Sequence, residues 1–258
     1  MGLESSEFGF LLIVLAIVLA SSQSEEGFGY QDNSLGPGQW GCLATNFSTC
    51  RTGTQQSPIN IKTRDAIDDC SLGKLRFHFS HSAGTLTSQK YLYRIGLDGD
   101  AENTVIIDGM EFRLVQFHFH HPSEHFIDGK KFELEAHLVY RAMDNSSRMA
   151  VVAQMYKKGE ENSLLAQVLD MKNNVRTLLD LREFNLGQEY FRYIGSLTTP
   201  PCTQGVTWTI LIKNKTASKQ QIKDLKQCLG GRNARPLQRT NRREVYMYTF
   251  YQNFLAKY

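Results

Sequence analysis

The chain has 258 residues, of which 41% are hydrophobic and 21% are charged, and its net charge at neutral pH is +3. This composition excludes an intrinsically disordered chain, a collagen-like rod and a membrane protein with several spanning segments. The excess of 29 basic over 26 acidic residues is too small to indicate a nucleic-acid-binding protein.

The first feature along the chain is an apolar run at residues 8–20, which small and polar residues follow. Because the run is short for a membrane span, we interpret residues 1–22 as a cleavable signal peptide and expect no membrane span in the mature chain. Glu4 and Glu7 precede the run where basic residues are usual, so an uncleaved anchor is the alternative. Export would permit disulfides and glycosylation, and possible glycosylation sequons begin at Asn46, Asn145 and Asn214.

The rest of the chain is dominated by short β-type runs with Gly, Asn and Asp clusters between them. Strands are predicted at residues 75–79, 91–95, 104–107, 112–120, 132–140, 150–156, 190–197 and 206–212. Helical spacing of apolar residues predicts helices at 162–171, capped by Asn162 or Ser163, and at 218–229. No linker or internal repeat interrupts the pattern, so residues 23–258 are expected to form one mainly β domain with a few peripheral helices.

All seven histidines lie between residues 78 and 137. On a strand at 116–120, successive side chains point to opposite faces, which puts His118 and His120 together on one face. The next predicted strand carries His137 on the same face as Glu135. If the two strands are neighbours, three imidazoles meet.

Three neutral imidazoles would leave zinc its full charge and one open position, which is typical of catalytic rather than structural zinc sites. Ordinary strand histidines are the alternative, and the spacing alone does not decide between them. The five cysteines, at 42, 50, 70, 202 and 228, form no CxxC pair, so they indicate neither a zinc ribbon nor a thioredoxin-type motif.

Several longer motifs are similar to those of α-class carbonic anhydrases, and most of all to plant secretory members. The motifs are Gln56-Ser-Pro-Ile59, Gln116-Phe-His-Phe-His120, Pro122-Ser-Glu-His125, Glu135-Ala-His-Leu-Val139, Ser196-Leu-Thr-Thr-Pro-Pro-Cys-Thr203, Val206-Thr-Trp208 and Asn233-Ala-Arg-Pro236. They occur in the family's order, and the resemblance extends from about residue 27 to residue 248.

The resemblance implies a central twisted, mostly antiparallel ten-stranded sheet and a Zn²⁺ cofactor held by His118, His120 and His137. It implies reversible hydration of carbon dioxide to bicarbonate and a proton through attack of zinc hydroxide. The family pattern assigns further residues by role. Gln116, Asn233 and Glu135 would orient the three ligands in that order, Thr198 and Glu124 would orient the nucleophile, and Thr199, Val139, Val151, Leu197 and Trp208 would complete the substrate pocket with Thr198. The resemblance also implies a Cys50–Cys202 disulfide and cis bonds at Ser57-Pro58 and Pro200-Pro201.

The match departs from the family at the proton shuttle. Fast members have a cleft histidine in an Asn-x-Gly-His pattern, whereas the nearest segment here, residues 79–85, has Gly84 or Ser82 at that position. His81 is the candidate substitute, His78 is a weaker one, and an uninvolved surface histidine is the alternative for both. His121 is read as a non-ligand and His125 as a structural histidine.

The complete ligand set favours an active enzyme with a small-molecule substrate. The alternative is a non-catalytic carbonic-anhydrase-like storage or binding protein, as some plant relatives are. We expect the secretory pathway as the location, in the apoplast, the vacuole, or a plastid reached by that route. The sequence leaves the oligomeric state open.

Overall fold

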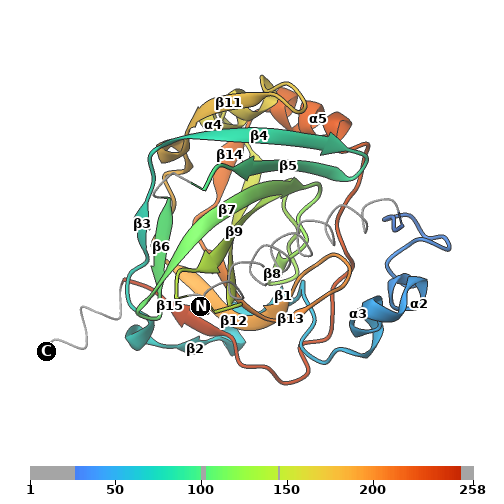
Figure 1. The fold of residues 1–258 in the computed structure, drawn as a ribbon. Coiled ribbons are helices and arrows are strands. Elements are labelled where there is room, and N and C mark those ends of the chain that lie inside the picture. The colour runs from blue at the N-terminus through green and yellow to red at the C-terminus, as the bar shows by residue number, and fades with distance from the viewer. Residues whose placement is uncertain (1–26, 100–102, 145, 251–258) are drawn as a thin grey trace, which may run out of the picture.

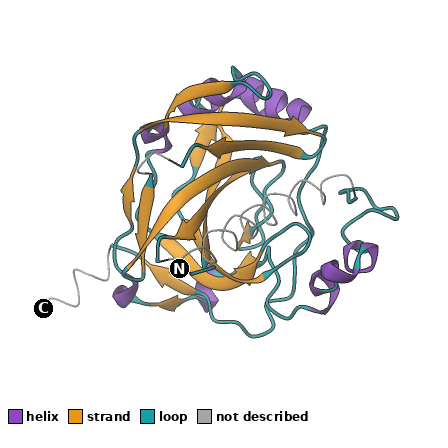
Figure 2. Ribbon diagram, viewed as in Figure 1, coloured by secondary structure: helices purple, strands orange, loops and turns teal. Residues whose placement is uncertain are grey.

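Strands make up most of the regular structure, and they join into one large twisted sheet (Figures 1 and 2). The structure is a computed structural model that describes residues 27–99, 103–144 and 146–250. The expected signal peptide, residues 1–22, and Asn145 lie outside the described residues.

The sheet has thirteen strands, and its main path runs through ten of them. In spatial order the path is β11 (Arg176–Asp180), β4 (His81–Gln89), β5 (Leu92–Leu97), β7 (Met110–His120), β9 (Leu134–Ala142), β10 (Met149–Lys158), β13 (Gln204–Leu211), β12 (Tyr190–Ser196), β15 (Tyr246–Tyr248) and β2 (Ile67–Asp68). Three strands lie off the path: β14 (Lys215–Ala217) pairs with β10, β6 (Thr104–Ile107) pairs with β7, and β3 (Arg76–His78) pairs with β6. A separate parallel pair joins β1 (Asn60–Ile61) to β8 (Phe126–Ile127).

Most neighbouring strands in the large sheet are antiparallel. The parallel pairs are β10–β13, β10–β14 and β15–β2. The expectation of a twisted, mostly antiparallel sheet with a ten-stranded centre is confirmed. In Figure 1 the sheet curves from β11, β4 and β5 at the top to β12, β15 and β2 at the bottom.

Helices lie around the sheet rather than within it (Figure 2). The α-helices are α2 (Trp40–Leu43), α3 (Thr49–Thr52), α4 (Ser163–Leu169) and α5 (Lys219–Cys228). The 3₁₀ turns are η1 (Thr45–Phe47), η2 (Thr63–Asp65), η3 (Cys70–Leu72) and η4 (Leu181–Phe184). The two predicted helices, α4 and α5, pack against each other, and Asn162 caps α4 while Ser218 and Gln221 form a capping box on α5.

All eight predicted strands are present, with ends that shift by a few residues. Four strands of the main path, β4, β11, β15 and β2, were not predicted. The inward positions of β4 are Ser82, Gly84 and Leu86, so it lacks the row of β-branched and aromatic residues that indicates a strand. Its ladders with β5 and β11 supply the hydrogen bonds that make this segment extended.

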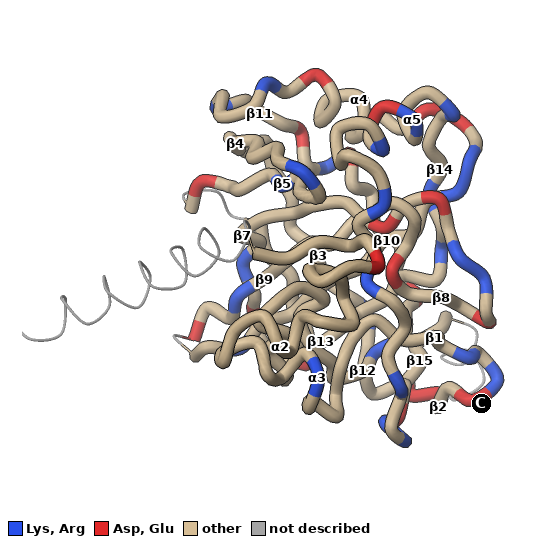
Figure 3. Tube along the Cα trace, turned by 90° about the vertical axis from the view of Figure 1, so that its right-hand side faces the viewer, with Lys and Arg blue, Asp and Glu red and all other residues tan. Residues whose placement is uncertain are grey.

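The sheet separates two apolar clusters. Phe117, Phe119 and Leu138 belong to the larger cluster, while Val139 and Trp208 belong to the other. Because side chains alternate along β7, its histidines face away from Phe117 and Phe119. The central strands are mostly without charge, and charged residues of both signs gather on outer turns and helices (Figure 3). Within the described residues, no helix has the length and apolarity needed to cross a membrane.

Candidate metal centre

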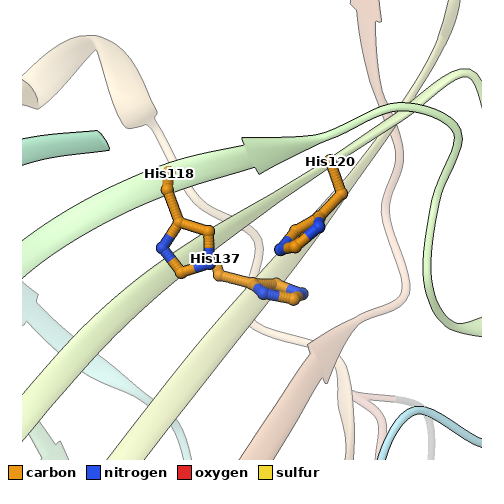
Figure 4. A group of neighbouring side chains, drawn as sticks. All are labelled: His118, His120 and His137. Carbon is orange, nitrogen blue, oxygen red and sulfur yellow. The ribbon is translucent and has the colours of Figure 1, made fainter. Parts of the chain in front are cut away.

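The ladder between β7 and β9 brings three histidines together. His118 pairs directly with His137, and His120, two residues along β7, lies on the same face. The ring centroids are 5.0 Å apart for His118 and His120, 5.2 Å for His118 and His137, and 4.5 Å for His120 and His137. Their rings point toward a common centre (Figure 4), and one nitrogen from each lies within 4.8 Å of the others.

Each imidazole is held by a hydrogen bond on the nitrogen that faces away from this centre. The Nδ1 of His118 is 2.9 Å from Oε1 of Gln116, and the Nε2 of His137 is 2.6 Å from Oε1 of Glu135. The Nδ1 of His120 is 2.8 Å from the backbone oxygen of Asn233. These bonds fix the rings so that Nε2 of His118, Nε2 of His120 and Nδ1 of His137 face inward.

Asn233 therefore serves His120 with its main chain, and its side chain has other partners. Its Oδ1 accepts from the backbone N–H of His121 at 2.8 Å. Its amide nitrogen donates to the backbone oxygens of Phe119 and Tyr91. The side chain thus ties the end of β7 to the turn between β4 and β5.

The donor set fits a metal ion of the zinc type. Burial, with neighbouring His137 among the other causes, lowers the pKa of His120, and burial together with His120, His137 and Arg94 lowers that of His118 well below its usual value. Neutral imidazole is the form that binds metals. Within the described part of the chain, the buried Nε2 of His120 has no hydrogen-bond partner. A buried nitrogen without a hydrogen-bond partner, in a group of three imidazoles, is suited to bind a metal ion.

Glu135 organises the protein side of the centre. Its Oε1 bonds to His137 and to Nδ1 of His125, and its Oε2 accepts from the backbone N–H groups of Glu124 and His125 at 2.7 and 2.8 Å. Burial opposes its ionisation, but His125 and His137 hold its pKa well below the usual value. The group His125, Glu135 and His137 also has metal-ligand spacing. Since its members bond to one another and His125 also bonds to Tyr193 at 2.7 Å, we interpret it as an orienting network.

Glu124 and Thr198 are both buried. The Oε1 of Glu124 accepts from the backbone N–H of Arg235 at 2.8 Å. Its Oε2 is 3.6 Å from Nε2 of His120 and, among the described residues, has no hydrogen-bond partner. One carboxylate oxygen is therefore anchored, and the other is available beside the three imidazoles.

The loop that carries Thr198 is tied down at several points. Leu197 donates its N–H to the backbone oxygen of Thr203 at 2.9 Å, and Cys202 donates to Thr199 at 2.8 Å. The expected Cys50–Cys202 disulfide is present. The Ser57-Pro58 and Pro200-Pro201 bonds are cis, as expected. The His121-Pro122 bond is also cis, which was not expected.

An apolar wall stands beside the imidazoles. Val139 and Val151 are cross-strand partners, and Val151 also pairs with Trp208. All three are buried, Leu197 packs against their cluster, and the Trp208 ring is 4.9 Å from that of His137. The expected pocket residues therefore lie together.

His81 lies apart from the other candidates. It sits at the start of β4, and its half-exposed ring is 3.6 Å from Asp180 and 3.2 Å from the guanidinium of Arg182. Thr87 is the residue of β4 in line with His118, because Thr87 pairs with Arg94 and Arg94 with His118. His81 precedes Thr87 by six positions, about 20 Å along an extended strand. The structure does not bring its side chain to the imidazoles.

The remaining expectations concern surface positions. Asn46 is exposed, and Asn214 is half-buried with its Oδ1 enclosed. Cys42, Cys70 and Cys228 are exposed and unpaired. His121 bonds to the backbone oxygen of Glu133 at 3.0 Å, and the fully buried His125 is part of the Glu135 network. Both positions agree with the interpretation of these two histidines as non-ligands.

Sequence reasoning missed Arg94 and Tyr193. Arg94 is the neighbour of His118 on β5, and Tyr193 holds His125 from β12. The signal for Arg94 lies in the alternation of the predicted strand at 91–95, but its use requires knowing that this strand pairs with β7. For Tyr193 no sequence signal exists without the sheet order.

Three inward-facing imidazoles on one face of a twisted sheet form a candidate metal-binding site. The chain matches the family model for eukaryotic-type carbonic anhydrases over residues 35–249. Alpha carbonic anhydrase 7 of Arabidopsis thaliana is 35% identical to it over 93% of each chain, and a carbonic anhydrase of Pectobacterium atrosepticum is 34% identical over 93% of this chain and 98% of its own. The chain belongs to the alpha carbonic anhydrase family, a family of enzymes.

Relatives with another name are about as similar. Dioscorin dioA3 of Dioscorea japonica is 34% identical over 92% of this chain and 93% of its own. A crystal structure of dioscorin complexed with ascorbate superposes with a TM-score of 0.81 at 35% identity, over 85% of this chain and 97% of that one. The alpha-carbonic anhydrase of Thermovibrio ammonificans, in complex with the inhibitor sulfanilamide, gives 0.78 at 32% identity, over 85% and 98%.

Proposed function

We propose that this protein holds Zn²⁺ through His118, His120 and His137 and catalyses the reversible hydration of carbon dioxide. The observation that carries the proposal is the set of three imidazoles, two buried and that of His118 partly buried, whose outer nitrogens are bonded while the inner Nε2 of His120 has no partner among the described residues. Bound there, zinc would act as a Lewis acid that supplies hydroxide at neutral pH, an effect for which carbonic anhydrase is the standard example.

The residues around the imidazoles would orient the reacting groups. Glu124 offers an acceptor in its unpartnered Oε2, which suits it to take the proton of the Thr198 hydroxyl in a hydrogen bond. The hydroxyl oxygen of Thr198 would then accept from the nucleophile and fix its direction. The backbone N–H of Thr198 forms no hydrogen bond within the described residues, so it can donate to a substrate oxygen.

Substrate binding would rest on the apolar wall. Carbon dioxide has no net charge or dipole, so a surface made of Val139, Val151, Leu197 and Trp208 is suited to hold it. Thr199, which follows Thr198 in the chain, would complete the pocket. The wall touches the ring of His137, which brings substrate and nucleophile together.

A non-catalytic storage or binding protein is the second candidate. The observation in its favour is the similarity to dioscorins, which equals the similarity to the carbonic anhydrases. The intact imidazole set and the available carboxylate oxygen of Glu124 favour the enzyme.

The test is elemental analysis for zinc together with carbon dioxide hydration that a sulfonamide inhibits. We expect about one zinc per chain and activity that Thr198→Ala lowers by about 10²-fold, whereas Thr198→Ser keeps most of it. Correctly folded protein that takes up no zinc and shows no hydration would overturn the proposal in favour of the non-catalytic alternative.

We further propose export by the signal peptide at residues 1–22, one domain over residues 23–258, and glycosylation at the exposed Asn46. The disulfide supports an oxidising compartment, since such bonds are rare in reducing ones. Mass spectrometry of the secreted protein from a plant host, before and after glycosidase treatment, would show the mature N-terminus and the occupied sites.

A further inference from the structure

The strands β4 and β5 extend the face of the sheet that carries the imidazoles. Arg94 of β5 pairs with His118 on one side and with Thr87 of β4 on the other, so the three side chains lie in one row on one face. In the next row Gly96 pairs with Gln116 and with Thr85. We call Thr85, Thr87, Arg94 and Gly96 the β4–β5 shelf.

Among the described residues, little packs against the shelf. Within that part of the chain, a Cβ atom placed on Gly96 would meet only a backbone oxygen of Thr85, at 4.0 Å. A Cβ on Gly84, which points to the opposite face, would lie 2.8 Å from the side chain of buried Ile95. Thr85, Thr87 and Arg94 are all partly exposed, whereas Ser82 and Leu86 on the opposite face of β4 are buried. The shelf is therefore a solvent-facing extension of the metal-centre face.

Arg94 lies beside the metal centre, because it is the cross-strand partner of His118. A guanidinium is permanently charged and has five N–H donors, so it can hold a carboxylate with two of them and keep an intramolecular partner on the others. The threonine hydroxyls in the neighbouring positions can donate as well.

We propose that the β4–β5 shelf is a subsite for a carboxylate or similar oxyanion, held by Arg94 with Thr85 and Thr87. The ligand is a small organic acid whose other end reaches the position in front of the three imidazoles. The inference rests on the proposed zinc site, because that site holds the other end of the ligand. The subsite would add a preference for negatively charged ligands, which the hydration of uncharged carbon dioxide does not require.

An arginine of β11, the edge strand next to β4, gives a matched control. Arg176 pairs with Thr85 across the β11–β4 ladder, and its Nε is 2.6 Å from Oδ2 of Asp98. Arg176→Gln removes a similar charge two strands farther from His118.

The experiment measures dissociation constants by calorimetry on the zinc-loaded full chain. The probes are benzenesulfonamide, the 3- and 4-sulfamoylbenzoates, and the corresponding uncharged sulfamoylbenzamides. We expect wild type to bind at least one sulfamoylbenzoate about tenfold more tightly than its amide, because a charge-assisted hydrogen bond is gained. Arg94→Gln should abolish this ratio, while Arg176→Gln should retain it. Higher salt should reduce the ratio in wild type.

Two negative outcomes are distinguishable. If benzenesulfonamide binds and neither acid is preferred over its amide, or if Arg94→Gln keeps the preference, the subsite is overturned and the proposed zinc site stands. If zinc-loaded protein binds no sulfonamide at all, the proposed zinc site fails and the subsite fails with it. Thermal unfolding of both variants checks that the fold is retained.

Discussion

Glu135 is the single residue on which most hydrogen bonds of the metal centre converge. Each of its two carboxylate oxygens accepts two bonds, from His125 and His137 on one side and from two backbone N–H groups on the other. An ionised carboxylate can accept on both oxygens, and no uncharged side chain can do so. The residue therefore links the orientation of a ligand to the stability of the fold.

Replacing Glu135 by Gln should damage both properties. The amide NH₂ would face two donors, which would leave buried N–H groups without acceptors. We expect the free energy of unfolding of the metal-free protein to fall by about 2–5 kcal/mol, and zinc affinity to fall by about 10–100-fold. Urea unfolding and competition for zinc with a chelator measure the two effects.

Gln116→Ala is the matched control for this prediction. Gln116 also orients a ligand, but through one uncharged bond at a partly buried position. Zinc affinity should fall by a similar factor, while the free energy of unfolding changes by only about 1 kcal/mol. Equal urea midpoints for Glu135→Gln and wild type would contradict the structural role of the carboxylate.

Among the elements, the hairpin of β4 and β5 shows where prediction from sequence ends. The histidine triad could be predicted because strand alternation and two adjacent strands were enough to bring His118, His120 and His137 together. The row of Thr87, Arg94 and His118 depends on a ladder between strands that are distant in the sequence. His81 was a candidate for the proton shuttle, with an uninvolved surface histidine as the alternative, and the structure places it at the start of β4, where it pairs with Asp180 of the edge strand β11.

The position of His81 leads to a prediction about proton transfer. Among the described residues, no histidine other than the three candidate ligands has its ring within their group, since His81 bonds near Asp180 and His125 is enclosed by Glu135 and Tyr193. Turnover should therefore rise with added imidazole, which can carry the proton in solution, and His81→Ala should have no effect. Stopped-flow hydration at increasing imidazole concentration tests this. A response that is flat in wild type and appears only in His81→Ala would show that His81 is the shuttle.

The capping box at the start of α5 leads to a prediction about the stability of the fold. Gln221 completes the capping box with Ser218, and its amide also exchanges two hydrogen bonds with the backbone of Asn162, at 2.9 and 2.7 Å, at the start of α4. Ser218→Ala should lower the free energy of unfolding by about 1 kcal/mol. Gln221→Ala should cost about 2–3 kcal/mol, because it also leaves the partly buried backbone N–H of Asn162 without its acceptor. Denaturant unfolding measures both, and equal costs would show that the bonds to Asn162 contribute nothing.

At the scale of the whole molecule, segments from both ends of the sequence meet beneath the Thr198 loop. Arg235 donates to the backbone oxygens of Cys50 and Ser57 and to Oε1 of Gln56. Gln56 in turn donates to the backbone oxygen of Cys202 at 3.1 Å. The Cys50–Cys202 bond therefore closes a junction that buried hydrogen bonds already define. The sequence motifs marked each part of this junction, but motifs without coordinates could not show that the parts share hydrogen bonds.

Removing that disulfide should separate stability from the chemistry of the metal centre. The bond joins residues 152 positions apart, and a loop of that length restricts the unfolded chain by up to about 5 kcal/mol in the chain-entropy view. We expect the double variant with Ser at positions 50 and 202 to lose about 2–5 kcal/mol of unfolding free energy. Zinc affinity should stay near that of wild type, because the three imidazoles and their acceptors lie on β7, β9 and at Asn233 and not on the segment that carries Thr198 and Cys202. Hydration should fall several-fold, since Thr198 would be held less firmly against Glu124. Urea unfolding, zinc competition and stopped-flow hydration on one preparation distinguish these effects, and a loss of zinc affinity as large as that of Glu135→Gln would contradict the separation.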